Sequence, residues 1–181
     1  MDSTITKSPT GELQLNLFEF AQRGQQLAGS VELADLPRLA ASACATPEQL
    51  RQLQAGWQLR GWVRQQPGAP DQPMLELRVQ AELPLLCQRC LQPALLAIED
   101  QALFRLVEQE PELTMDELEA DDEALCVQGA TDLLPLIEDQ LILALPLVPM
   151  HDSCPQPLPR GQQEQPLVSP FAVLAGLKRQ S

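Results

Sequence analysis

Two runs of alternating apolar and polar residues constrain the fold of this chain most strongly. Residues 57–64 alternate apolar with polar side chains, and residues 75–83 repeat the pattern. Period-two alternation is typical of a strand with one buried and one solvent-exposed face. The residues between them, 65–73, contain three prolines and a glycine, which favour a loop. We therefore expect an antiparallel hairpin.

Further alternating segments extend this hairpin into a larger sheet. Residues 95–107 place apolar side chains on one face, and shorter strands are expected at 13–17, 30–33 and 124–127. The fold class expected from this pattern is α+β. It consists of an antiparallel β-meander, either open or partly closed into a barrel, packed with a few short helices.

Three segments carry helix signals. Residues 18–27 favour a short helix, and the sequence Thr46-Pro-Glu-Gln matches a capping box with proline at the first helical position. Asp132 can cap a third helix, in which apolar residues recur at helical spacing. Its stripe should bury against the sheet, which leaves Glu138 and Asp139 facing solvent.

The length and composition allow one domain with tails. The chain has 181 residues, of which 44% are hydrophobic, while aromatic residues make up only 3%. We expect a flexible tail at 1–10 and a single α+β domain at 11–154 with an acidic loop at 108–123. A proline-rich linker at 155–168 and a short docking helix at 169–181 follow.

Acidic residues dominate the charge but are concentrated in one place. Asp and Glu total 25 against 12 Lys and Arg, for a net charge of −13, and nine acidic residues lie within 108–123. The bulk basicity of most nucleic-acid-binding proteins is absent. The acidic run is interpreted as a solvated loop; the alternatives are a phosphate mimic or a docking site for a basic protein.

Hydropathy gives no sign of membrane insertion or secretion. The first twenty residues lack the apolar core of a signal peptide. The most apolar stretch, 133–150, contains Glu138 and Asp139 and is broken by Pro146 and Pro149. We expect a soluble cytoplasmic protein without a membrane partner, in which the thiols stay reduced.

Two surfaces are candidates for partner binding. Arg60, Trp62, Arg64 and Arg78 fall on the polar face of the hairpin, where arginines beside an aromatic ring could bind single-stranded RNA. The same residues could equally be ordinary solvated or helix-covered strand residues.

The second candidate surface is at the C-terminus. Phe171, Leu174 and Leu177 share one face of the expected helix at 169–181. A helix this short is not stable alone in water, so it should dock on its own domain or on a partner.

The cysteines suggest a metal site. Cys87 and Cys90 form a CxxC pair between two expected strands, and His151 precedes Cys154 by three residues. Three thiolates and one imidazole suit zinc, so these four residues are the candidate ligands of one zinc ion. A redox-active pair and a plain reduced turn are the alternatives.

Three segments together resemble a known family. They are Leu86-Cys-Gln-Arg-Cys-Leu91, the long Leu/Pro-rich segment from Asp132 to Asp152 with its central Glu-Asp pair, and Pro170-Phe-Ala-Val-Leu-Ala-Gly-Leu-Lys-Arg179. Their order and spacing resemble the YceD family, described as large ribosomal RNA subunit accumulation proteins. Some branches of that family carry a second, cysteine-richer cluster where this chain has only His151-Asp-Ser-Cys154.

The resemblance implies a cytosolic factor needed for accumulation of large-subunit ribosomal RNA, with no catalytic residues to transfer. Because the chain is so acidic, we expect it to contact large-subunit precursors or basic ribosomal proteins, with any RNA contact confined to the Arg/Trp face. The alternatives are a zinc- or thiol-dependent enzyme and a general protein-binding adaptor.

Overall fold

The computed structural model describes residues 13–68, 70–112, 114–115 and 119–155. The strands are β1 (Gln14–Asn16), β2 (Gln26–Glu32), β3 (Gln54–Arg64), β4 (Gln72–Leu86), β5 (Pro93–Val107), β6 (Glu123–Cys126) and β7 (Ala130–Asp132). The helices are α1 (Leu17–Gln22), the 3₁₀ helix η1 (Leu33–Asp35), α2 (Pro37–Ala40), α3 (Pro47–Gln52) and α5 (Leu133–Leu143).

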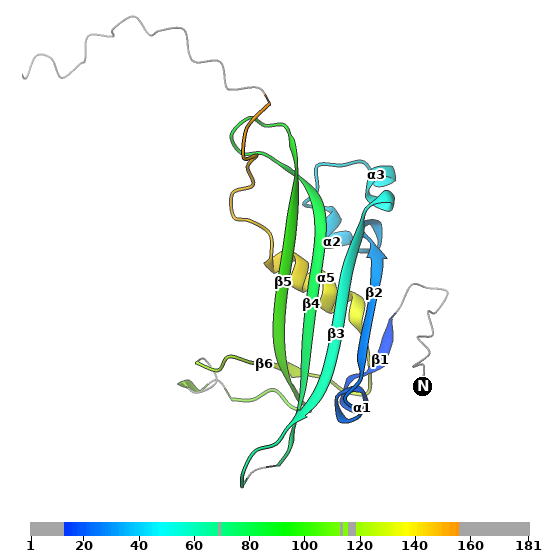
Figure 1. Cartoon of the computed structure of the whole chain (residues 1–181), viewed down its shortest axis with the longest axis vertical. Helices are drawn as coiled ribbons and strands as arrows, with labels where there is room; N and C mark the ends of the chain where they lie inside the picture. The colour runs from blue at the N-terminus through cyan, green and yellow to red at the C-terminus, as the bar shows by residue number, and fades with distance from the viewer. Residues whose placement is uncertain (1–12, 69, 113, 116–118, 156–181) are drawn as a thin grey trace, which may run out of the picture.

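The main sheet has the strand order β2-β3-β4-β5-β6 and is not closed into a barrel (Figure 1). Its first four strands form the predicted antiparallel meander, which confirms the α+β class. β6 differs, because it pairs with the end of β5 in parallel. A parallel pair needs a crossover rather than a tight turn, and the long acidic segment after β5 provides it. β1 and β7 form a separate antiparallel pair.

The helices lie against one face of the sheet and leave much of the other face open (Figure 1). Alternate residues of β3, β4 and β5 point into the core beneath α1 and α5, as the sequence predicted. The largest fully buried side chains include Phe20 from α1, Leu77 from β4 and Leu133 from α5. Leucine supplies most of this core, in keeping with the low aromatic content.

The local helix signals were correct at their starts. Thr46 caps α3 in a complete capping box, and the Asp132 carboxylate accepts from the Leu134 N–H at the start of α5. The helix predicted at 18–27 is shorter, because α1 ends at Gln22. Gly24, with φ of 61°, turns the chain directly into β2.

Glycine is required where α1 crosses β3. A Cβ atom added at Gly61 would lie 2.7 Å from the Cα atom of Ala21 and 2.8 Å from the Phe20 ring. The first of these atoms belongs to the backbone and cannot rotate away. Gly61 therefore sets how closely α1 packs on the sheet.

The expectation that Glu138 faces solvent was wrong. This side chain is only 5% exposed, and its carboxylate accepts from the backbone N–H groups of Arg38 and Leu39 at 2.6 and 3.1 Å. The Arg38 Nε atom donates to the other oxygen at 2.8 Å. Glu138 thus caps α2, whose own N-cap residue makes no side-chain cap. Asp139 is exposed, as predicted, and pairs with Arg38.

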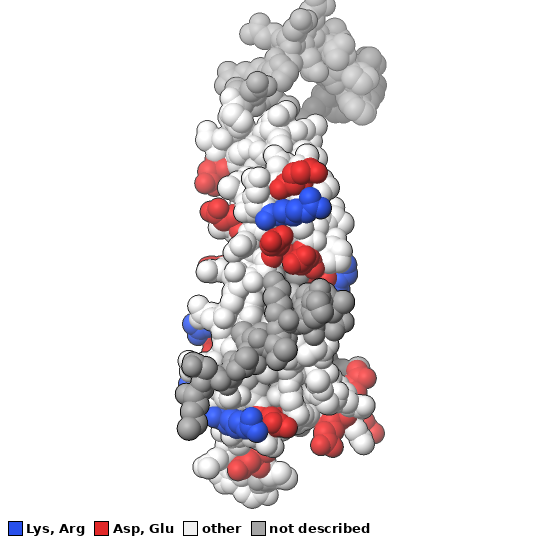
Figure 2. Space-filling view, turned by 90° about the vertical axis from the view of Figure 1, so that its right-hand side faces the viewer, with Lys and Arg blue, Asp and Glu red and all other residues white. Residues whose placement is uncertain are grey.

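The surface carries charges of both signs. On the face shown in Figure 2, the few Lys and Arg side chains lie beside Asp and Glu side chains, and uncharged residues cover most of the area. Among the described residues, no helix has the length and apolar character needed to cross a bilayer.

Candidate metal centre

The turn that joins the end of β4 to the start of β5 meets an extended arm. The turn contains Cys87 and Cys90; the Cys87 carbonyl accepts from the Leu91 N–H at 2.9 Å, and Leu91 takes a left-handed φ of 58°. The arm follows α5 and runs along the outer edge of β5 (Figure 1). It is attached to the turn by a hydrogen bond of 2.9 Å from the Gln88 N–H to the Pro149 carbonyl.

This attachment brings the four predicted ligands together. One donor atom from each of Cys87, Cys90, His151 and Cys154 lies within 4.8 Å of all the others. The Sγ atoms of Cys87 and Cys154 are 3.9 Å apart, and the Cys90 Sγ atom is 3.4 Å from the His151 Nδ1 atom. Zinc bonds of about 2.3 Å to sulfur and 2.0 Å to nitrogen give donor separations of roughly 3.5–3.8 Å in a tetrahedron. The observed separations fit that geometry.

The histidine ring is oriented as a ligand requires. Its Nε2 atom lies 3.0 Å from the Pro93 carbonyl oxygen. A carbonyl can only accept, so Nε2 is the donor; in the neutral ring that a metal would need, Nδ1, which lies 3.4 Å from the Cys90 sulfur atom, then carries the lone pair. Metal-bound histidines commonly hold their second nitrogen in this way.

The surroundings of the thiols favour one thiolate in particular. Burial raises the pKa of the Cys87 thiol, but N–H groups of Cys90, His151 and Arg89 and the His151 ring outweigh burial and lower the pKa to about 5. The pKa of the Cys90 thiol is instead raised, by burial and by the nearby sulfur atoms of Cys154 and Cys87. A cation among these sulfur atoms would relieve their mutual repulsion.

Arg89 belongs to the site, although the sequence analysis did not single it out. Its Nε atom donates to the Cys154 Sγ atom at 2.9 Å, and its Nη2 atom donates to the His151 carbonyl at 2.7 Å. The sulfur atom also raises the pKa of the Arg89 guanidinium. Three thiolates with Zn²⁺ carry a net charge of −1, so Arg89 would neutralise the centre. Its position between the two cysteines of the CxxC motif is the sequence feature that could have identified it as part of the site.

The four side chains together could complete the coordination of one metal ion. With four protein donors, a tetrahedral zinc ion has no open position for a substrate, unlike a catalytic zinc with three ligands. The redox alternative lacks its usual support, because Cys87 follows a strand and enters a turn rather than starting a helix. Cys44 and Cys126 are exposed and lie outside the four-residue group.

The predicted Arg/Trp face does not form a free basic surface. Arg60 stacks over the Trp62 ring at 5.6 Å, and Arg78 pairs with Glu76 at 2.9 Å. Arg64 pairs with Asp122, an acidic residue of the predicted loop. The arginines are therefore largely engaged within the chain.

Asp122 fixes one end of the acidic segment on the sheet. Its side chain is 9% exposed and also pairs with Arg105 at 3.1 Å. Met74 is paired in register with Trp62 and Arg105 and is fully buried. Because Met74 lies on the same face as Trp62 and Arg105, its burial shows that the residues around Asp122 cover this end of the otherwise open face. Phe171, Leu174 and Leu177 lie outside the described residues.

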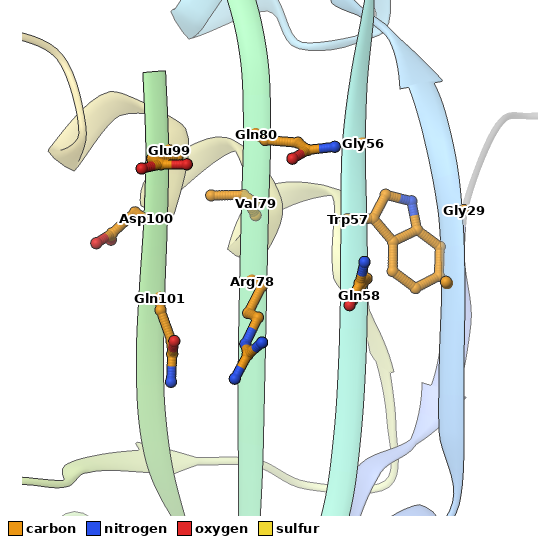
Figure 3. A pocket seen from close by; sticks show the side chains of 11 residues that line it. Gly29, Gly56, Trp57, Gln58, Arg78, Val79, Gln80, Glu99, Asp100 and Gln101 are labelled. Atoms are coloured by element: carbon orange, nitrogen blue, oxygen red, sulfur yellow. The ribbon is translucent and has the colours of Figure 1, made fainter. Parts of the chain in front are cut away.

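Farther along the open face is a shallow polar hollow of about 700 Å³ (Figure 3). Side chains of Gln58, Arg78, Gln80 and Gln101 line it from three neighbouring strands, with Glu99 at one side. Amide groups and mixed charges give it no preference for one ligand class.

Comparison with known protein families matches the part of the chain that contains the Cys/His cluster. A family model described as Large ribosomal RNA subunit accumulation protein YceD matches residues 75–178. The chain belongs to the YceD family. The matched region contains most of β4, all of β5 and α5, and all four candidate ligands.

One relative within the family is the Large ribosomal RNA subunit accumulation protein YceD of Haemophilus influenzae. It is 37% identical over 114 residues, which cover 56% of this chain and 63% of the relative. The match therefore spans less than two thirds of the relative's length. No solved structure matches this chain.

Proposed function

We propose that this protein is a non-enzymatic factor that promotes accumulation of large-subunit ribosomal RNA, and that its Cys/His cluster binds one structural zinc ion. Membership of the YceD family carries the first part. The convergence of Cys87, Cys90, His151 and Cys154 supports the second.

The closed geometry of the cluster supports a structural rather than a catalytic role. When bound, zinc supplies a cross-link between the β4–β5 turn and the arm after α5. The chain's own residues hold the two parts in place: Gln88 and Arg89 donate to the arm, and Pro93 orients His151. The zinc would thus fix the arm beside β5.

Charge limits how the protein reaches its target. With a net charge of −13, the protein gains little from attraction to RNA phosphates. Two of the three arginines of the candidate face also form ion pairs within the chain, with Asp122 and Glu76. The protein therefore acts through precursor particles or basic ribosomal proteins, and RNA contact is local. Tight binding to naked ribosomal RNA at physiological salt would contradict this route.

A depletion strain tests the proposed function. Loss of the protein should lower the level of large-subunit ribosomal RNA relative to the small-subunit RNA, and the wild-type chain should restore it. Unchanged RNA levels would overturn the proposal. Co-sedimentation of the protein with large-subunit precursors tests the route of contact.

Cysteine variants test the metal centre separately. Cys87→Ser/Cys90→Ser should abolish binding of one equivalent of zinc. Cys44→Ser/Cys126→Ser is the matched control, because it also removes two thiols but leaves the cluster intact. Zinc retained by the first variant, or lost by the control, would refute the assigned ligands.

A further inference from the structure

Exposed apolar side chains are concentrated in the two chain segments next to the Cys/His cluster. In the described part of the chain, seven of the eight exposed large hydrophobic residues lie in the segments 86–95 and 143–150, which the cluster joins. We call this set the arm surface: Leu86, Leu91, Leu95, Leu143, Leu147, Val148 and Met150. Exposed hydrophobic residues gathered in this way mark an interaction site.

A groove of about 600 Å³ lies within this region, between the outer edge of β5 and the arm. Leu96 and Ile98 line one side, and Pro146, Val148 and Met150 line the other. Glu99 and Asp152 add two negative charges along it, and Arg89, whose guanidinium donates to the Cys154 sulfur atom and the His151 carbonyl, adds one positive charge. The groove therefore suits an apolar segment that carries positive charge.

We infer that the groove is the docking site of the C-terminal segment 169–181 of the same chain. The sequence predicts that Phe171, Leu174 and Leu177 share one face of a short helix. Lys178 and Arg179 follow directly and complement the acidic groups of the groove.

The position of the chain end supports an intramolecular contact. The described residues end at Pro155, next to Cys154 of the cluster, so the chain leaves the domain beside the groove. The 13 residues 156–168 span about 20 Å as a flexible coil and roughly 40 Å when extended. Because His151 and Asp152 themselves line the groove, this linker begins at the edge of the groove.

Tethering also favours this occupant over a second copy. A short linker gives an effective concentration in the millimolar range, well above that of a separate protein molecule at micromolar concentration. The same contact would order a segment that is too short to remain helical alone. The family match continues to residue 178, so most of the segment lies in the same matched region as the groove.

Backbone NMR spectra of the isolated 181-residue chain test this inference. Phe171→Ser/Leu174→Ser/Leu177→Ser should shift amide resonances of 95–99 and 144–150 and leave the open face unchanged. Leu158→Ser/Leu167→Ser/Val168→Ser is the matched control, since it removes three apolar side chains from the linker. The control should shift neither region.

A change in the groove provides the reciprocal test. Val148→Asp should release the segment, so its amide signals should sharpen to random-coil positions. Met115→Asp, at the exposed hydrophobic residue outside the arm surface, should not do so.

Three results would overturn the inference. The first is no shift in the groove with the Phe171 triple variant, and the second is an equal shift with the linker control. The third is a shift that requires high protein concentration and doubles the mass in light scattering, which would assign the groove to a second copy. The inference does not depend on the proposed function, because each readout is made on the isolated protein.

Discussion

Replacement of Glu138 should destabilise the fold more than any other change of a single charged residue on α5. Its carboxylate accepts from two backbone N–H groups at the start of α2 and from the Arg38 side chain. Glu138→Ala leaves the backbone N–H groups of Arg38 and Leu39 without the carboxylate that accepts from them at the start of α2. A buried unsatisfied donor costs about 1–3 kcal/mol, so we expect a loss of about 2–4 kcal/mol in the free energy of unfolding.

Urea denaturation of the zinc-loaded protein measures this loss. The midpoint should fall while the slope stays constant, and the melting temperature should fall by about 2–4 °C for each kcal/mol. Glu138→Gln keeps one oxygen acceptor and should lose roughly half as much. Asp139→Asn is the matched control, because Asp139 is half-exposed and pairs only with the Arg38 side chain.

Two results would refute the reasoning. The first is a Glu138→Ala variant within about 0.5 kcal/mol of the wild type, which would mean that water replaces the carboxylate at no cost. The second is an equal loss in Asp139→Asn, which would mean that the attraction between charges, rather than the cap on α2, provides the stability.

Three further substitutions have expected outcomes. Arg89→Gln should weaken zinc binding about 10- to 100-fold in a chelator competition assay, and an unchanged affinity would show that the guanidinium does not support the thiolates. Gly61→Ala should lower stability by about 1–3 kcal/mol, because the new methyl group meets the Ala21 backbone. Gly56→Ala, which meets only a flexible glutamine, should have little effect in the same thermal melt. Asp122→Asn should lower the urea midpoint by an amount equivalent to about 1–2 kcal/mol, and no change would mean that its ion pairs do not stabilise the sheet.

The sequence predicted those parts of the fold that depend on neighbouring residues. The alternation in 57–64, 75–83 and 95–107 identified three strands, and the Thr46 capping box identified the start of α3. Both signals are complete within about ten residues. Glu138 was misplaced because its partners lie about 100 residues away, and helical periodicity contains no information about them.

The direction of β6 was missed for a related reason. An apolar tetrapeptide after an acidic segment predicts a strand but not whether it runs parallel or antiparallel to its neighbour. The four candidate ligands were predicted as one group because their chemistry narrowed the choice to a CxxC pair, a third cysteine and the single histidine, and the structure brings these residues together. Arg89 was missed, since an arginine in a turn usually faces solvent.

The sequence separation of the ligands has a consequence for how the protein is made. Cys87 and Cys90 lie in one turn, but their partners at the cluster are 61 to 67 residues farther along the chain. During synthesis, the first pair is made before α5 and the arm exist. Full coordination must then wait until α5 has packed on the sheet and carried the arm to the turn. If the cluster binds zinc as proposed, uptake of the metal would mark the end of folding, and nascent chains stalled before residue 151 should bind zinc weakly through two sulfur atoms alone.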